Sequence, residues 1–368
     1  MNPALDRAAR LWKAIPPPDL DWALDGLDWL RAWGLRLLGR DGASMWVGRE
    51  KRAAFLGVGM LSFSLCIALT FPVALFGLGP IVYGVPHILA DIRYLLARPG
   101  LSKRPLFLGA LVVGCALGAA GLGVRGAIVG AALALAASRA PLPRKVAGIG
   151  VAFLVFGACQ WAGWYADLAF VHVHNFVAIA IWLLWRKHES RLHWIFTALF
   201  FGASAIILLG GAEPILARTG GLSAPWTDLA LRDVVRGVSW PNPGVWGTRL
   251  VVLFVFAQAA HYVVWLRLVP EDDRPSPAPR SYKKTYRAMT ADVGGLVMWG
   301  ALIGSLVFAV WAFDSVGGAR NAYLRMAFFH GHLELIAVAV LWAEGLFPFV
   351  PQRLAARALP AEAEAAQV

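Results

Sequence analysis

Residues 53–79 read AAFLGVGMLSFSLCIALTFPVALFGLG, a run with no charged side chain. A helix that crosses the hydrocarbon core of a bilayer needs about 20 such residues, so this stretch is long enough to span a membrane. Residues 301–313, ALIGSLVFAVWAF, are equally free of charge. Over the 368 residues of the chain, 59% are hydrophobic and 15% are charged, and the mean hydropathy is +0.62. These values predict an all-α polytopic integral membrane protein, built as a bundle of transmembrane helices.

Apolar stretches separated by charged or turn-forming segments predict about ten transmembrane spans. We expect them at residues 53–76, 80–97, 105–122, 125–138, 146–163, 168–185, 193–211, 247–268, 292–313 and 323–346. The stretch 105–138 is rich in Gly and Ala, which allows close packing between neighbouring helices. All three cysteines lie in apolar runs far apart in the chain, so neither a disulfide framework nor a CxxC metal site is predicted.

Lysine and arginine recur in every second segment between the predicted spans. They are Arg49, Lys51 and Arg52; Arg98, Lys103 and Arg104; Arg139, Arg144 and Lys145; Arg186, Lys187 and Arg191; Arg274, Arg280, Lys283, Lys284 and Arg287; and Arg353 and Arg357. Basic residues accumulate on the cytoplasmic side of a membrane, so both termini are predicted to be cytoplasmic, with the protein in the cell inner membrane. Because these residues occupy short loops, topology accounts for the net charge of +12, and no nucleic-acid partner is expected.

The chain is predicted to divide into a cytoplasmic N-terminal segment (1–52), a transmembrane domain (53–346) and a cytoplasmic tail (347–368). The N-terminal segment lacks the short apolar core and cleavage site of a signal peptide, so the first span is expected to act as its own insertion signal. Within it, residues 16–40 mix Trp and Leu with charges, which is typical of an amphipathic helix in the membrane interface. A solvated helix packed against a neighbouring loop is the alternative.

The long outer loop 213–247 contains several Gly and Pro residues together with Trp226, Trp240 and Trp246. Tryptophan is enriched where a membrane meets water, and loops of this length often carry function. We therefore regard the loop as a candidate lid that rests at the outer interface.

Histidine is concentrated inside the predicted spans. Four of them contain GVPHILADIRYLL (84–96), DLAFVHVHNFVAIA (167–180), FAQAAHYVVWLRL (256–268) and AFFHGHLEL (327–335). Six of the eight histidines belong to these stretches: His87, His172, His174, His261, His330 and His332. Ionisable groups within a bilayer are costly and face a bundle interior or a cavity, so each is a candidate functional residue. His188 and His193 lie beside a basic loop, and we expect them at the surface.

Counting along the predicted spans places most of these histidines in the outer half of the bilayer, with Asp91 and Glu334 one turn deeper. His261 counts as deeper still and is expected to line the floor of the same cavity.

Helical spacing predicts which polar side chains share a face. His87 and Asp91 are four residues apart, as are His330 and Glu334, so a carboxylate could hold the second ring nitrogen of each histidine. Residues two apart on a helix point about 200° away from each other. His172 and His174, or His330 and His332, can therefore meet at one metal only where the helix is irregular, which Gly331 would allow in the second pair.

Neutral imidazoles suit iron, copper and zinc, and a nitrogen-rich site with open positions is typical of oxygen chemistry or of metal-bound water. All six intramembrane histidines are therefore candidate metal ligands. Asp91 and Glu334 are candidate catalytic groups that orient the ligands or move protons. For any single histidine, an interhelical hydrogen bond is the alternative.

The residues Gly84, Pro86, His87 and Asp91 resemble the G-x-P-H-x-x-x-D segment of the Brp/Blh-type β-carotene dioxygenases. These are multi-span bacterial and archaeal membrane proteins that cleave carotene to retinal with a histidine-bound iron. Ile88 stands where members commonly have glycine. The resemblance implies Fe²⁺ as the cofactor, His87 as a ligand supported by Asp91, and a lipophilic substrate that enters from the bilayer.

Three classes of function follow from the sequence. The first is a membrane-embedded, non-haem metal oxygenase or related oxidoreductase acting on a lipid-soluble substrate such as a carotenoid, with iron favoured and copper or zinc as alternatives. The second is a b-type cytochrome with haem held by two histidines. The third is a proton- or metal-coupled transporter in which the polar groups form a relay. The sequence contains no GxxxxGK[ST], HExxH or GxSxG motif, and it does not indicate an oligomeric state.

Overall fold

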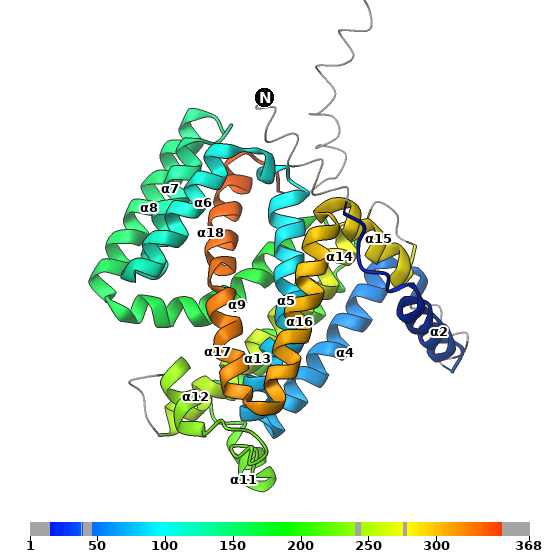
Figure 1. Cartoon of the computed structure of the whole chain (residues 1–368). Coiled ribbons are helices and arrows are strands. Elements are labelled where there is room, and N and C mark those ends of the chain that lie inside the picture. Colours follow the sequence, from blue (N-terminus) through cyan, green and yellow to red (C-terminus); the bar gives the residue numbers. More distant parts are fainter. Residues whose placement is uncertain (1–14, 38, 40–45, 240–243, 275–277, 348–368) are drawn as a thin grey trace, which may run out of the picture.

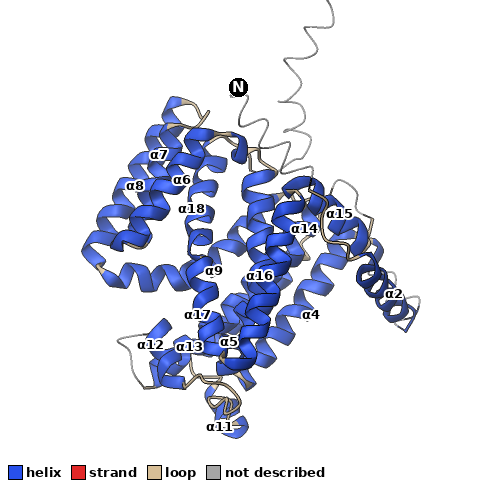
Figure 2. Ribbon diagram, viewed as in Figure 1, coloured by secondary structure: helices blue, strands red, loops and turns tan. Residues whose placement is uncertain are grey.

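The computed structural model describes residues 15–37, 39, 46–239, 244–274 and 278–347, and within these ranges it contains helices and loops but no strand (Figure 2). The helices are α2 (Asp21–Leu37), α4 (Arg49–Thr70), α5 (Pro72–Asp91), η1 (Ile92–Ala97), η2 (Leu101–Lys103), α6 (Pro105–Leu117), η3 (Gly118–Leu122), α7 (Val124–Ala136), α8 (Leu142–Ala162), α9 (Trp164–Trp185), α10 (His193–Leu208), α11 (Glu213–Thr219), α12 (Leu231–Val238), α13 (Val245–Val263), η4 (Val264–Leu268), α14 (Val269–Asp272), α15 (Tyr282–Val293), α16 (Gly295–Asp314), α17 (Val316–Met326) and α18 (Phe328–Ala343). The predicted all-α polytopic membrane protein is confirmed.

Each of the ten predicted spans corresponds to a helix or to consecutive helices. Within the described residues, 8 helical segments are long and apolar enough to cross a membrane. Of the other two, α10 forms with α11 a pair bent by 76°, and α7 has only 13 residues.

Two span boundaries differ from the prediction. The sequence places the first break near residues 77–79, whereas α4 ends at Thr70 and α5 begins at Pro72. Proline is favoured in the first turn of a helix, where its missing N–H would have no partner. The last span begins at Val316 instead of residue 323, and it is interrupted at Ala327. Polar residues early in α17 lower the local hydropathy, and so conceal this part of the span.

Helix α13 lies at the centre of the bundle, with most of its side chains buried. It contacts α4, α5, α9, α10 and α12, while α6, α7 and α8 form a second group beside α18 (Figure 1). Small residues bring α6 and α7 close together, because a Cβ added to Gly126 would lie 2.6 Å from the carbonyl oxygen of Gly114. The glycines predicted to favour close packing are therefore used in that way.

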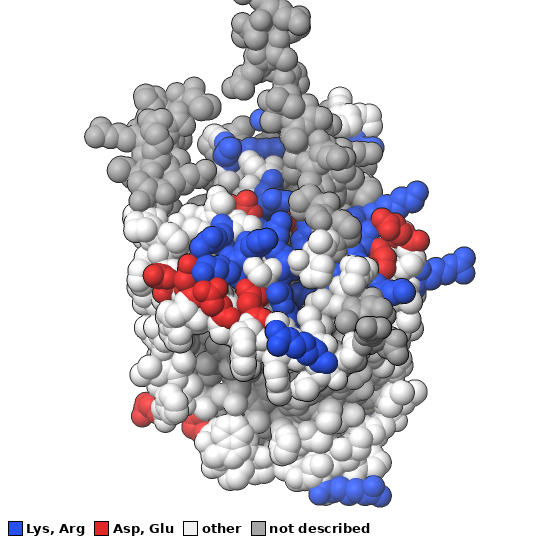
Figure 3. Space-filling model, turned by 90° about the vertical axis from the view of Figure 1, so that its right-hand side faces the viewer, with Lys and Arg blue, Asp and Glu red and all other residues white. Residues whose placement is uncertain are grey.

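Charged side chains gather toward one end of the molecule. Figure 3 shows lysine and arginine concentrated in the upper part of one face, while the lower part is almost entirely uncharged. This is the end at which α14 and α15 lie in Figure 1. It is also the side that the distribution of basic loops assigns to the cytoplasm. The candidate basic residues Arg353 and Arg357 lie outside the described residues.

Helix α2 presents two different faces. Lys283 of α15 lies 3.0 Å from the Asp21 carboxylate and 2.9 Å from that of Asp25. On the other face, Trp22, Trp29 and Trp33 are 79%, 63% and 52% exposed. The acidic face thus packs on α15, which lies in the predicted loop between the spans 247–268 and 292–313. The exposed tryptophans would suit a helix in the membrane interface, so both predictions stay open.

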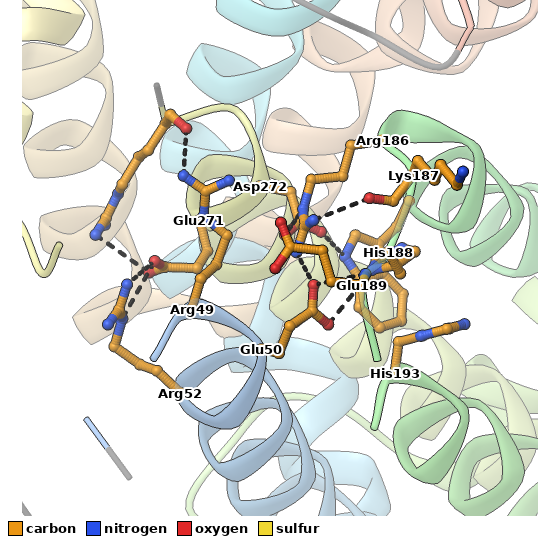
Figure 4. A network of polar contacts seen from close by, with 12 residues as sticks. Arg49, Glu50, Arg52, Arg186, Lys187, His188, Glu189, His193, Glu271 and Asp272 are labelled. Carbon is orange, nitrogen blue, oxygen red and sulfur yellow. Dashed lines mark hydrogen bonds and ion pairs between the residues drawn. The ribbon is translucent and has the colours of Figure 1, made fainter. Parts of the chain in front are cut away.

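Charged residues at the basic end form a network between helices (Figure 4). Arg52 and Glu271 are fully buried and form an ion pair. Arg186 joins Glu50 of α4 to Asp272 of α14. The network ties the ends of α4, α9 and α14 together.

His188 and His193 belong to the same region, and their rings stack with centroids 4.2 Å apart. Both residues are half-buried at the charged end of the molecule, so they lie at the surface as predicted but are not freely exposed. The loop that carries them folds back onto the helix ends because Ser190 donates a hydrogen bond to the Glu50 carboxylate.

Part of the outer loop covers the opposite end of the bundle. Its short helix α12 packs on α5, α9 and α13 through buried Val234 and Val238. Trp226 and Trp246 are 63% and 57% exposed, whereas Trp240 lies outside the described residues.

Replacing Glu271 by Ala tests the buried ion pair. Arg52 would stay buried without its carboxylate, so the free energy of unfolding should fall by about 3–5 kcal/mol. Thermal unfolding of the detergent-solubilised protein measures the change. Glu213→Ala is the matched control, because the Glu213–Arg249 pair is partly exposed, and its loss should cost less than about 1 kcal/mol. Equal losses in the two variants would contradict this account.

Candidate metal centre

Four histidines from four different helices converge inside the bundle. They are His87 of α5, His174 of α9, His261 of α13 and His330 of α18. The Nε2 atoms of His87 and His261 are 3.0 Å apart. The ring centroid of His330 lies 5.3 Å from that of His87 and 5.8 Å from that of His174. The ring centroids of His174 and His261 are 5.3 Å apart. We call these four residues the histidine cluster.

Backbone carbonyls orient two of the rings. Nδ1 of His174 donates to the carbonyl of Phe170 at 3.1 Å, and Nδ1 of His330 donates to that of Ala327 at 2.5 Å. A carbonyl can only accept a hydrogen bond, so each Nδ1 carries the proton and each Nε2 keeps a lone pair in the neutral ring. Metal-binding histidines are commonly held by such a partner on the second nitrogen.

Two buried carboxylates complete the group. Oδ2 of Asp91 lies 3.3 Å from Nε2 of His87, and Oε1 of Glu334 lies 3.5 Å from Nε2 of His261. Their exposed fractions are 0% and 1%. The spacing predicts that Glu334 hydrogen-bonds the ring nitrogen of His330 that does not bind the metal. The structure instead places Asp91 and Glu334 beside the Nε2 atoms of His87 and His261, on the side where a metal ion would bind.

The cluster is short of hydrogen-bond partners and of positive charge. Within the described part of the chain, neither carboxylate accepts a hydrogen bond of good geometry, although the Trp265 indole lies beside Glu334, and Nδ1 of His87 and Nδ1 of His261 form no such bond either. No lysine or arginine of the described residues forms an ion pair with Asp91 or Glu334. Buried polar groups are normally satisfied by protein, water or an ion. Ligand atoms of His87, His261 and His330 lie within 4.8 Å of one another, as do those of His87, Asp91 and Glu334, so each set could hold a metal ion.

The histidine cluster lies near mid-height, and not in the outer half as the sequence predicts. His87 lies about halfway along Pro72–Ala97, and His261 about halfway along Val245–Asp272. The misplaced start of the second span made His87 seem shallow, and so made His261 seem deeper than the others. Both residues in fact meet at one level.

Irregular backbone adjoins the cluster on three of its helices. A π-helical turn, η1, follows Asp91 directly, and another, η4, begins three residues after His261. The break at Ala327 precedes His330 by three residues. Such irregularities shift the facing of the side chains around them and are frequent at functional sites.

The two remaining histidines of the predicted set point elsewhere. Nε2 of His172 hydrogen-bonds the carbonyl of Val238 at 2.7 Å. His332 packs on Phe328 with ring centroids 4.5 Å apart, and a Cβ at Gly118 would collide with its Nε2. The structure thus brings together four of the six predicted ligands. Gly331 lies within regular helix, so the deformation that would turn His332 inward does not occur.

A cavity of about 500 Å³ lies beside the cluster. All four histidines of the cluster line it, and so does His332, together with Phe170, Gln258, Tyr262, Tyr323 and Arg320. Gly84 admits the Tyr323 ring, because a Cβ there would collide with it. The sequence analysis did not single out Tyr262 and Arg320, because tyrosine and arginine are also common where the ends of spans meet the membrane interface.

A second group of candidate ligands, Glu50, His188 and His193, lies at the basic end. Its carboxylate already forms an ion pair with Arg186. Burial lowers the pKa of His188, so its ring stays neutral near pH 7. This group therefore has its charge balanced without a metal, in contrast to the histidine cluster.

No protein-family model, no curated protein and no solved structure matches this chain. The assignment of the site consequently depends on its geometry.

The two HxH pairs supply their own controls. His174→Ala and His330→Ala should each lower bound metal at least about tenfold, because each removes a ring that faces the cluster. His172→Ala and His332→Ala remove rings that lie outside the cluster and should leave metal content unchanged. Metal bound per purified protein, by mass spectrometry, measures both. The opposite ranking within either pair would contradict the assignment.

Proposed function

We propose that this protein is a membrane-embedded, non-haem metal oxygenase or related oxidoreductase that acts on a lipid-soluble substrate. The observation that carries the proposal is the histidine cluster with its two buried carboxylates, which pair with imidazoles but with no lysine or arginine among the described residues. Two carboxylates in a dry interior are costly unless positive charge accompanies them. A divalent cation held by the neighbouring imidazoles would supply that charge.

The donor set fits a first-row transition metal. Imidazole nitrogens combined with carboxylate oxygens suit iron, zinc and copper better than Mg²⁺ or Ca²⁺, which prefer all-oxygen sites. His87, His174, His261 and His330 would hold the ion, which would supply Lewis-acid or redox chemistry toward oxygen. Asp91 and Glu334 would balance its charge and accept or return protons beside Nε2 of His87 and of His261.

Access for an apolar substrate supports the same function. A groove between α4, α5 and α13 is lined by lipid-facing side chains, including Phe63 and Tyr83, which are 64% and 44% exposed. Gln258 and Tyr262 line both this groove and the cavity beside the cluster. A lipid-soluble molecule could therefore reach the cluster from the bilayer by displacing these two side chains.

The resemblance of residues 84–91 to the Brp/Blh-type dioxygenases favours iron and a carotenoid-like substrate. Of the two residues to which the resemblance assigns roles, His87 belongs to the histidine cluster, and Asp91 contacts it at 3.3 Å.

Haem is a poorer fit to the same histidines. The rings of the cluster make edge contacts at centroid distances between 4.6 and 5.8 Å, so no flat macrocycle fits between any two of the contacting rings.

Metal analysis and oxygen uptake test the proposal together. Protein reconstituted in lipid nanodiscs should contain about one equivalent of metal, show no Soret band, and consume oxygen when β-carotene is added. A chelator should abolish uptake, and iron should restore it. His172→Ala is the control, with uptake like that of the original protein, because His172 belongs neither to the cluster nor to the lining of the cavity. Absence of bound metal would contradict the proposal, as would a Soret band. Stoichiometric metal that crosses sealed vesicles without oxygen uptake would favour the transporter.

If a metal ion compensates the charge of the two carboxylates, removing them should change the free energy of unfolding in opposite directions in metal-free and metal-loaded protein. In metal-free protein, Asp91→Asn with Glu334→Gln should raise the free energy of unfolding by about 1–3 kcal/mol, because two unsatisfied carboxylates are removed. In metal-loaded protein, the same double variant should be less stable than the original. Thermal unfolding with and without chelator measures both effects. A loss of stability in both states would show that the carboxylates stabilise the fold without a metal.

A further inference from the structure

Arg320 of α17 is a buried cation in the wall of the cavity. It lines the cavity beside Tyr262 and Tyr323, and its exposed fraction is only 8%. Nε donates to the carbonyl of Phe76 at 3.0 Å, and Nη1 donates to Oδ1 of Asn321 at 3.3 Å. The guanidinium also stacks on the Phe76 ring, with Cζ 3.5 Å from its centroid. The plane of the guanidinium is therefore fixed on two sides.

This arginine differs from the other buried arginines in the described part of the chain. Arg52 and Arg274 both pair with Glu271, and Arg93 pairs with Asp292. Arg320 has no carboxylate partner among the described residues; its recorded partners are a carbonyl, an amide and an aromatic ring. A guanidinium has five N–H donors, and two are used, so about three remain for a ligand in the cavity. Burying a cation without an anion is costly, which is why such groups are normally paired.

We propose that Arg320 binds the carboxylate of an acidic, lipid-soluble substrate. A planar guanidinium matches a carboxylate through two parallel hydrogen bonds, and this pairing is strongest where water is excluded. A cavity of about 500 Å³ accepts a ligand of drug size and would leave the bulk of a phospholipid outside. The proposal rests on the function proposed above for the reaction and narrows its substrate to lipid-soluble molecules with a carboxylate, for which β-carotene serves only as a hydrocarbon analogue. Binding at Arg320 itself requires no metal.

The placement of Arg320 also predicts which part of the substrate reacts. Its guanidinium contacts the backbone of Phe76, and His87 lies eleven residues further along α5. At 1.5 Å per residue this separation is roughly 16 Å along the helix axis. A substrate anchored by its carboxylate at Arg320 would therefore present the interior of its hydrocarbon chain to the histidine cluster, and not the carbons next to the carboxylate.

Binding of a fluorescent polyene acid tests the anchor. The probes are cis-parinaric acid and its methyl ester, which differ in charge at one end only, titrated into nanodisc-embedded protein above the pKa of the acid. The original protein should bind the acid at least about tenfold more tightly than the ester, and Arg320→Gln should reduce this ratio to about one. Arg320→Lys keeps the charge but loses the planar fork, so it should fall between them.

Arg325→Gln is the matched control, because Arg325 lies on the same helix but is exposed and does not line the cavity. It should keep the acid-to-ester ratio of the original protein. Equal binding of acid and ester by the original protein would overturn the proposal, as would an unchanged ratio in Arg320→Gln. The titration is run on metal-free and metal-loaded protein. A preference for the acid in protein that takes up no metal when iron, copper or zinc is supplied would support the anchor while contradicting the oxygenase, so the two failures are distinguishable.

Discussion

The cost of placing ionisable groups in a dry interior is the constraint on which this structure depends. Hydrocarbon offers no hydrogen bonds, so each polar group inside the bundle must find its partner in the protein or in something that the protein binds. The backbone carbonyls of Phe170 and Ala327 satisfy one nitrogen each of His174 and His330. Within the described residues, the carboxylates of Asp91 and Glu334 accept no hydrogen bond of good geometry, and only the Trp265 indole lies beside Glu334 as a donor. The protein has thus gathered more acceptors than it can satisfy from within.

The buried polar groups gather around one central helix. Helix α13 contacts α4, α5, α9, α10 and α12, and it carries His261 at the level where the other histidines arrive. The π-helical turns after Asp91 and shortly after His261 occur on the two helices whose imidazoles come closest together. Regular helices would fix the facing of each residue by its spacing alone. At an irregular turn the facing of the residues shifts. The imidazoles can therefore point toward one another, while side chains elsewhere on the same helices still pack against other neighbours.

The sequence predicted the membrane bundle, its ten apolar elements and the residues of the cluster, because hydropathy and the rarity of intramembrane charge are strong signals. It could not choose within the HxH pairs. Helical spacing shows that only one histidine of each pair can face a given site, but the neighbours that His172 and His332 find, Val238 and Gly118, are distant in sequence. Depth failed for a different reason, because the start of α5 at Pro72 is a matter of local backbone chemistry and is invisible to an average of hydropathy.

Arg320 and the histidine cluster are two separate electrostatic problems in one cavity. If the carboxylates of the cluster were the counter-ions of Arg320, neither a metal nor an anionic substrate would be required. Asp91 lies fifteen residues beyond Phe76 along α5, which is roughly 22 Å, and at an effective dielectric constant of about 20 one pair of unit charges at that separation interacts by less than about 1 kcal/mol. That is less than the several kcal/mol needed to bury one ion. Compensation across the cavity is therefore too weak, and each charge calls for a partner of its own: a cation at Asp91 and Glu334, and an anion at Arg320.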